Sequence, residues 1–153
     1  MPMLKYFDVF KSVSLPNSNT RKSCQWIKKN YPDDDITFIV DRSGNARKTS
    51  ADKTDVDIIR EFGYKVNYLN NLSEKDKLNY CNFELEKGII QIDEKEGSYL
   101  IDDLEAVTLT EEGVINKKDK TITHQSDSLA YSVAWLVRKK KESRSIDGYL
   151  NLM

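Results

Sequence analysis

Apolar residues along this chain follow two different spacings, which alternate from one segment to the next. Short runs of consecutive or alternating apolar residues predict β-strands at residues 4–13, 36–40, 64–69 and 89–92. Turn-forming residues such as proline, glycine and asparagine lie between these runs and other segments. We therefore expect four strands, each separated from the next by other elements.

Between the strands, apolar residues recur every three or four positions, as they do on one face of a helix. The first four predicted helices start near Thr20, Thr54, Ser73 and Ser98. Their hydroxyl groups are suited to capping a helix N-terminus. A fifth helix, from Asp127 to about Lys139, is apolar around most of its circumference and should pack deeply. The alternation predicts an α/β fold with a largely parallel sheet flanked by helices.

The length and composition predict a single domain. With 153 residues, of which 39% are hydrophobic, the chain can bury one adequate core. We expect this domain to span residues 1–141, with a polar tail at 142–153. The 24 basic and 25 acidic residues give a net charge of -1, which argues neither for nor against nucleic-acid binding.

Cysteine usage and hydropathy indicate a soluble protein of the cytoplasm. Cys24 and Cys81 lie far apart in the sequence, each on the apolar face of a predicted helix, so buried free thiols are expected in a reducing compartment. No apolar run approaches the length of a membrane span, and residues 1–5 lack the features of a signal peptide. We expect no membrane partner.

Three side chains are candidates for chemistry. His124, the only histidine, lies three residues before Asp127, where a loop is expected to become the apolar helix. A helix N-terminus stabilises a carboxylate through its free N–H groups and its dipole. Asp41 directly follows the apolar run 36–40, at the expected end of a buried strand. Two acids at element ends suggest one metal site, although an Asp near a helix start is more often a cap than a ligand.

Three segments, in this order, resemble the nuclease domain of tailed-bacteriophage terminase large subunits. In residues 39–47, Asp41 ends a strand and is followed by Arg, Ser and Gly. Residues 55–63 are a predicted helix, and residues 123–131 carry a His-x-x-Asp sequence that leads into an apolar helix. The likeness runs from about residue 6 to residue 137.

The resemblance implies an RNase H-like mixed sheet flanked by helices. It also implies a metal-dependent endonuclease that cuts concatemeric viral DNA when packaging begins and ends. Carried over position by position, Asp41 is the strand-end metal carboxylate, Asp127 is the helical one, and His124 is the histidine that accompanies it. The implied cofactor is Mg²⁺ or Mn²⁺, because two such ions can activate water and stabilise the departing oxygen of a phosphodiester.

The loop after Asp41 is basic. Arg42, Arg47, Lys48 and Lys53 could bind a DNA backbone by charge, and a loop that is only solvated is the alternative interpretation. The partners implied by the resemblance are double-stranded DNA, other terminase subunits and the portal, in the cytoplasm of a bacterial host.

The chain departs from the family at its beginning. Family members open this domain with a strand that carries an Asp in a pattern like Gly-x-Asp-x-Gly, and nothing here matches it. Asp8 lies on what resembles a later strand, and the ATPase motor that normally precedes the nuclease is also absent from this sequence. We therefore expect an N-terminally truncated domain whose sheet lacks a pairing partner, which favours self-association.

Other acids could in principle replace the carboxylate of that strand. They are Asp93, Glu94, Asp102, Asp103 and Glu105. Acids beside a short strand or on the outer face of an amphipathic helix are usually solvated, so we expect these side chains to face water.

Three functional hypotheses follow. The first is a terminase-type endonuclease domain with Asp41 and Asp127 as metal ligands. The second is a catalytically impaired prophage remnant, or an assembly or DNA-binding module, that keeps the fold. The third is another RNase H-like nuclease such as a resolvase, which would need further acids near Asp41 and Asp127.

Overall fold

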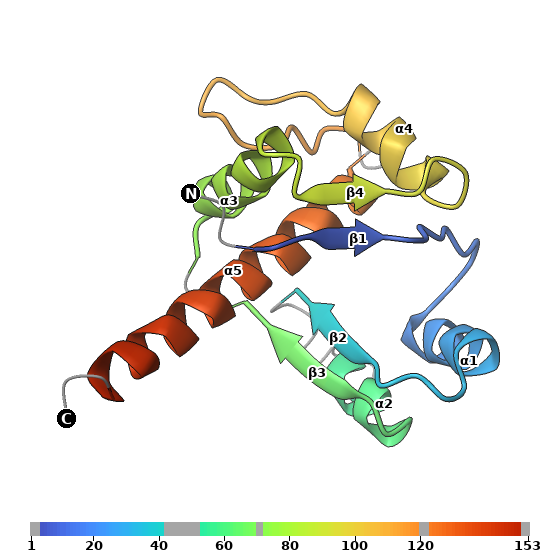
Figure 1. The fold of residues 1–153 in the computed structure, drawn as a ribbon. Coiled ribbons are helices and arrows are strands. Elements are labelled where there is room, and N and C mark those ends of the chain that lie inside the picture. Colours follow the sequence, from blue (N-terminus) through green and yellow to red (C-terminus); the bar gives the residue numbers. More distant parts are fainter. Residues whose placement is uncertain (1–3, 42–52, 70–71, 120–122, 151–153) are drawn as a thin grey trace. The chain divides into compact units, whose positions relative to one another are not determined.

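The structure is a computed structural model. It describes residues 4–41, 53–69, 72–119 and 123–150, with side chains up to Glu142. Strands and helices alternate along the chain, which confirms the mixed α/β class (Figure 1).

Four strands and five helices occur in the described residues. The strands are β1 (Phe7–Val9), β2 (Thr37–Val40), β3 (Lys65–Tyr68) and β4 (Ile90–Ile92). The helices are α1 (Thr20–Asn30), α2 (Asp55–Glu61), α3 (Glu74–Glu86), α4 (Ser98–Ala106) and α5 (His124–Leu150). The strands form two parallel pairs, β1 with β4 and β2 with β3. All four strands fall inside the predicted runs, and the parallel direction is confirmed.

The chain divides into two compact units. Residues 14–70 form the inserted unit, and residues 1–13 together with 71–153 form the split unit. The inserted unit lies within the connection that leads from β1 to β4. A single RNase H-like sheet and a single domain over residues 1–141 stay predictions.

The core of the split unit is built around α5. Leu129, Ala130, Val133 and Val137 of this helix are each at most 5% exposed, which confirms the deep packing that its sequence predicts. Three other elements of the same unit contribute one buried residue each to the cluster: Cys81 of α3, Ile90 of β4 and Leu100 of α4. Burying this apolar surface is the main stabilising contribution that α5 makes to the unit.

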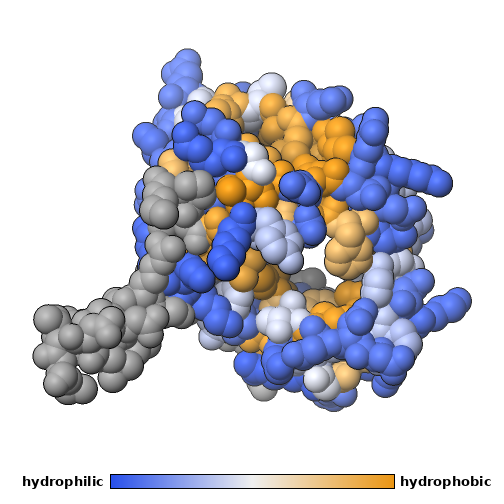
Figure 2. Space-filling view, in the orientation of Figure 1, coloured by the Kyte–Doolittle hydropathy of each residue, from blue (hydrophilic) through white to orange (hydrophobic). Residues whose placement is uncertain are grey.

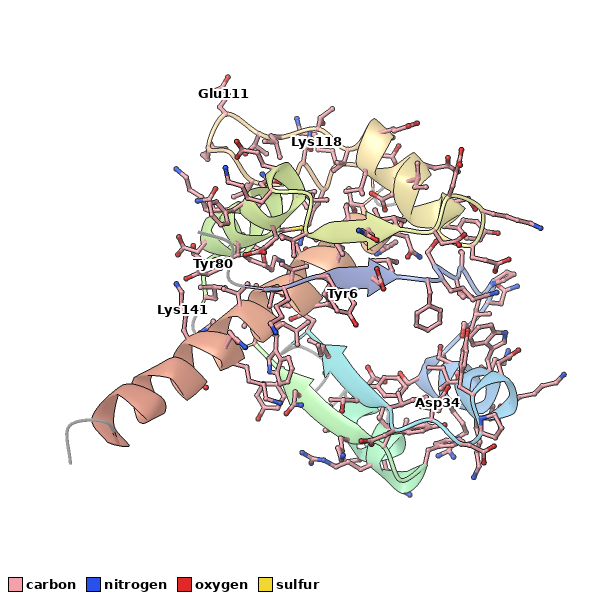
Figure 3. The ribbon with its side chains drawn as sticks, viewed as in Figure 1. Tyr6, Asp34, Tyr80, Glu111, Lys118 and Lys141 are labelled. Carbon is pink, nitrogen blue, oxygen red and sulfur yellow. The ribbon has the colours of Figure 1, made fainter. Side chains whose placement is uncertain are left out.

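The two faces of β1 differ. Phe7 and Val9 pack against the core of the split unit and pair with Ile90 and Ile92 of β4. Alternate side chains along a strand point to opposite faces. Accordingly, the aromatic residues on either side of β1 are exposed, Tyr6 by 69% and Phe10 by 66% (Tyr6 is labelled in Figure 3). Hydrophobic side chains reach the visible surface among hydrophilic ones (Figure 2).

The inserted unit has a small core of its own. Cys24 of α1 and Val56 and Ile59 of α2 are at most 2% exposed. A hydrogen bond of 2.6 Å from the Thr20 hydroxyl to Asp55 Oδ1 joins the starts of the two helices. Together with Cys81, the buried Cys24 confirms the expectation of two buried free thiols.

At two of the first four helices, the residue expected to cap the N-terminus does so. Thr54 and Ser73 each accept a hydrogen bond from the backbone N–H three residues later, and the Asp57 carboxylate completes a capping box at α2. The cap of α1 is Asn19 rather than the expected Thr20. Asn19 accepts from the backbone N–H of Lys22, which leaves the Thr20 hydroxyl available to bond Asp55.

Helix α5 is longer at both ends than the sequence suggests. It begins at His124 instead of Asp127, and it continues to Leu150 instead of about Lys139. Residues 139–147 contain several good helix formers and neither Gly nor Pro, so nothing in their chemistry ends the helix at the predicted point. No helix among the described residues combines the length and the apolar character that crossing a membrane requires.

Candidate functional site

The carboxylate of Asp127, in the first turn of α5, is held by two lysines. Lys77 of α3 donates from Nζ to Asp127 Oδ1 over 2.7 Å, and Lys117 donates to Oδ2 over 3.1 Å. Both ammonium groups also lie close to Glu74 Oε2, that of Lys77 at 2.8 Å and that of Lys117 at 3.5 Å. These four side chains, two acidic and two basic, form what we call the lysine–carboxylate cluster.

Lys77 is the buried member of the cluster. Its side chain is only 3% exposed, and its ammonium group lies 3.7 Å from the centre of the Tyr131 ring. A buried charge is costly unless it is paired and hydrogen-bonded, and an aromatic face stabilises it further. Asp127, Glu74 and Tyr131 together supply those interactions, so the cluster ties the start of α3 to the start of α5.

The lysines determine the charge of Asp127. Partial burial alone would raise the pKa of its carboxyl group, but the hydrogen bonds and charges of Lys77 and Lys117 outweigh burial and lower that pKa below its ordinary value. Burial likewise opposes the charge of Lys117, and its bond to Asp127 reverses the effect, so the pKa of Lys117 is raised. Both groups are therefore ionised at neutral pH.

A second acid, Asp103 of α4, caps α5. Its Oδ2 accepts from the backbone N–H of Gln125 over 2.8 Å, and its Oδ1 accepts from the Ser126 hydroxyl over 2.7 Å. Asp103 is 6% exposed, so the expectation that it faces water is wrong. The free N–H groups at the start of a buried helix need acceptors, and Asp103 from the neighbouring helix supplies one. Acids near helix starts often cap the helix, but here Asp103 has that role and the carboxylate of Asp127 accepts from lysines instead.

His124 is the first residue of α5 and is exposed. The sequence places it three residues before Asp127, and the helix confirms that both lie in the same first turn. Its imidazole is thus accessible at the end of the helix where the dipole and the free N–H groups point outward.

Asp41 lies in the inserted unit, directly after the last residue of β2, and is exposed. It lines a shallow hollow of about 350 Å³ together with residues from α1, β2 and α2. The polar lining residues are Thr20, Ser23, Asp41 and Asp55. This is the strand-end position that the sequence predicts. Asp41 and Asp127 belong to different units, so a metal site shared by the two stays a prediction.

One of the four basic residues expected to bind DNA is described. Lys53 is exposed and forms an ion pair with Glu61 of α2. Glu61 also accepts from Arg21 of α1 over 3.1 Å, and these two hydrogen bonds lower the pKa of its carboxyl group. Arg42, Arg47 and Lys48 lie outside the described residues.

The described residues do not fit a divalent metal ion at Asp127 as they stand. Mg²⁺ and Mn²⁺ need several oxygen ligands, and both oxygens of Asp127 are already engaged by ammonium groups. Within the described ranges, no three His, Cys, Asp or Glu side chains group closely enough to hold a metal. Any metal at Asp127 would first have to replace a lysine.

Lys77 is the member of the cluster that the sequence pattern indicates least. A lysine in an amphipathic helix normally faces water, and α3 contains many charged residues. The available signal was its spacing, because Lys77 lies four residues before Cys81 and seven before Glu84, on one face of the helix. All three are buried, so this face of α3 carries a cation and an acid on either side of a thiol.

Comparison of the chain with protein-family models, with curated proteins and with solved structures found no match.

Proposed function

We propose that this chain is a nuclease domain of a phage terminase large subunit. In this proposal it has an RNase H-like fold and hydrolyses phosphodiester bonds of double-stranded DNA with Mg²⁺ or Mn²⁺. It acts in the cytoplasm of a bacterial host, with other terminase subunits or the portal as partners, and it self-associates.

The position of two acids supports the proposal most directly. Asp41 immediately follows β2, a strand of a parallel pair, and Asp127 lies in the first turn of α5, a helix whose next turns are buried. The ends of parallel strands and the starts of helices are where functional groups gather in α/β proteins. These are also the two surroundings that the resemblance assigns to metal carboxylates. His124 shares the turn of Asp127, as the His-x-x-Asp sequence requires.

Cleavage of supercoiled plasmid tests the proposal. Purified protein is incubated with plasmid and Mn²⁺, Mg²⁺ or EDTA, beside the variants Asp41→Ala and Asp127→Asn. We expect metal-dependent nicking that falls at least 100-fold in both variants. Asp34→Ala is the matched control, because Asp34 is an exposed acid of the inserted unit (labelled in Figure 3) and should leave nicking unchanged. Nicking that survives the loss of Asp41 or Asp127 would overturn the assignment of that residue.

One observation favours a second candidate, a module that binds DNA or an assembly partner without cutting. Lys77 and Lys117 balance the charges of Asp127 and Glu74, which is the state expected of a structural ion pair. Fluorescence anisotropy with labelled duplex DNA in EDTA distinguishes the candidates. A folded protein that binds DNA but never nicks it in Mn²⁺ supports the second one.

A further inference from the structure

We propose that one side of α5, in the part of the helix that follows its buried turns, binds the phosphate backbone of double-stranded DNA. This surface, which we call the basic face, consists of Arg138, Lys139 and Lys141 with the rings of Trp135 and Tyr80. The inference rests on the proposed function, which supplies the DNA. The contact lies away from the lysine–carboxylate cluster and needs no metal ion.

The charge of this part of α5 differs from that of the chain. Residues 138–142 contain four basic side chains and one acid, Glu142, and so have a net charge of +3, whereas the whole chain has -1. Basic residues near the end of a helix interact with its dipole, but that effect is confined to the last turn. Here α5 continues from Lys141 to Leu150, about two and a half turns further. The dipole therefore does not account for these cations, and a polyanionic partner does.

Two lysines of the basic face lie over aromatic rings. The ammonium of Lys139 is 4.9 Å from the centre of the Trp135 ring, and that of Lys141 is 4.7 Å from the centre of the Tyr80 ring, which belongs to α3. A ring attracts a cation without neutralising it, whereas a carboxylate balances its charge. A side chain that is already ordered also loses less conformational freedom when it binds. The rings thus prepare these lysines to contact phosphate groups.

Tyr80 adds a hydrogen-bond donor to the basic face. Lys141 Nζ donates to the Tyr80 hydroxyl over 3.0 Å (both residues are labelled in Figure 3). A tyrosine oxygen that accepts one hydrogen bond can still donate its own hydrogen. Lysine, arginine and tyrosine side chains are among the groups that contact the phosphate oxygens of DNA. Tyr80 and Lys141 are therefore suited to bind one phosphate together.

Helical position separates the basic face from the neighbouring Lys140. Arg138 and Lys139 follow Trp135 by three and four residues, so the three side chains share one side of α5. Lys140 follows Arg138 by two residues and points to the opposite side. Lys139, Lys140 and Lys141 are all exposed, and the last turns of α5 extend away from the β1–β4 strand pair of the same unit (Figure 1). Lys140 is therefore a matched control, equally exposed and equally charged.

Binding of a fluorescent duplex of about 30 base pairs, measured by anisotropy between 50 and 200 mM salt, tests the inference. EDTA is present throughout, so that no strand is cut. Each lysine–phosphate contact contributes ~0.9 to the steepness with which log K falls against log[salt]. We expect Lys139→Gln and Lys141→Gln each to reduce that slope by about 1. The double variant should bind about tenfold more weakly at 100 mM salt.

Three further variants isolate the charge of the basic face. Lys140→Gln removes the same charge from the opposite side of α5 and should change the slope by less than about 0.3. Lys141→Arg keeps the charge and should keep the slope of the wild type. Tyr80→Leu removes the ring and the hydroxyl but no charge, so it should weaken binding about 2–5-fold at an unchanged slope. Circular dichroism shows whether each variant is folded before it is titrated.

The outcomes separate this inference from the proposed function. If the wild type binds the duplex and Lys139→Gln and Lys141→Gln leave the slope unchanged, or if Lys140→Gln reduces it equally, the inference is overturned and the DNA contact lies elsewhere on the chain. Displacement of the duplex by an equal charge of poly-L-glutamate indicates a surface for acidic proteins and also overturns it. A folded wild type that binds no duplex overturns both the inference and the proposed function.

Discussion

Asp103 of α4 and Asp127 of α5 both lie beside the start of α5, but they have different partners. Asp103 is buried, and its two carboxylate oxygens accept hydrogen bonds from the backbone N–H of Gln125 and the hydroxyl of Ser126. Asp127 turns instead toward Lys77 and Lys117. Since one acid satisfies the backbone, the other is available for interactions with cations.

Replacing Asp103 by Ala should lower the free energy of unfolding by about 1–3 kcal/mol, because it removes the carboxylate that accepts from the partly buried N–H of Gln125 and from the buried hydroxyl of Ser126. Urea denaturation followed by circular dichroism measures the change. The neighbouring acid Asp102 is exposed, and Asp102→Ala should shift stability by less than about 0.5 kcal/mol. Equal effects of the two substitutions would contradict the capping role.

Both thiols should be inert in the folded protein. Burial raises the pKa of Cys81 to about 12 and raises that of Cys24 as well, although Arg21 opposes the shift at Cys24. The reactive thiolate is therefore scarce near neutral pH. With an aromatic disulfide reagent at pH 8, we expect both cysteines to react only at the rate of unfolding, and at once in denaturant. Rapid labelling of native protein would show that the thiols are accessible.

At the residue scale, the sequence predicted what carries a recognisable motif and missed what depends on partners. Asp41 and His124 occupy the strand end and helix start that their neighbours in the sequence indicate. Lys77 is buried only because Asp127, fifty residues away, meets its ammonium group. No local sequence pattern contains that pairing, because it joins residues of two helices that are far apart in the sequence.

At the scale of elements, the cluster fastens α3 to α5. Its strength depends on pH through Asp127, whose pKa in the folded protein is lower than its ordinary value. A carboxylate of this kind contributes stability above its ordinary pKa of 3.8, and the contribution is lost as the pH falls through the lowered value. The boundaries of elements were predicted less well than their order. Caps such as Asn19 and Asp103 depend on which nearby side-chain oxygen lies within hydrogen-bonding distance of the free backbone N–H groups.

Comparing the wild type with Asp127→Asn from pH 2 to pH 6 tests this dependence. At pH 6 we expect the variant to be less stable by about 1–3 kcal/mol, because it loses a charged hydrogen-bond partner of Lys77. The difference should shrink as the pH falls below 3.8 and the carboxyl group of the wild type becomes protonated. Differential scanning calorimetry provides the measurement, and a difference independent of pH would contradict the ion pairing.

At the scale of the whole molecule, the chain has two cores, one in each unit. The single domain over residues 1–141 that the total apolar content predicts stays a prediction, because composition does not reveal how buried residues are divided between segments. Each unit also has one tryptophan, Trp26 in α1 and Trp135 in α5. Tryptophan fluorescence can therefore report on the two units separately.

Ile59→Ala should destabilise the inserted unit by about 2–5 kcal/mol, since Ile59 is 2% exposed and its truncation leaves a cavity. Each unit is followed in a variant that keeps a single tryptophan: Trp135→Phe leaves Trp26 as the reporter, and Trp26→Phe leaves Trp135. We expect Ile59→Ala to lower the urea midpoint more when Trp26 is the reporter. The reciprocal substitution, Val133→Ala in α5, should move the Trp135 signal more. Equal shifts of both reporters in both variants would show that the two units unfold as one.

The pairing of β1 with β4 has a consequence for the order of events during synthesis. Phe7 leaves the ribosome before its partner Ile90, which follows only after the whole inserted unit, and the core residues of α5 follow later still. In contrast, Thr37 and its partner Lys65 are close in sequence. Contacts between distant segments form slowly, and nascent chains fold as their segments emerge. β1 therefore stays unpaired, beside the exposed Tyr6 and Phe10, while residues 14–70 are synthesised, and its backbone N–H and C=O groups are open to pairing with other chains during that time.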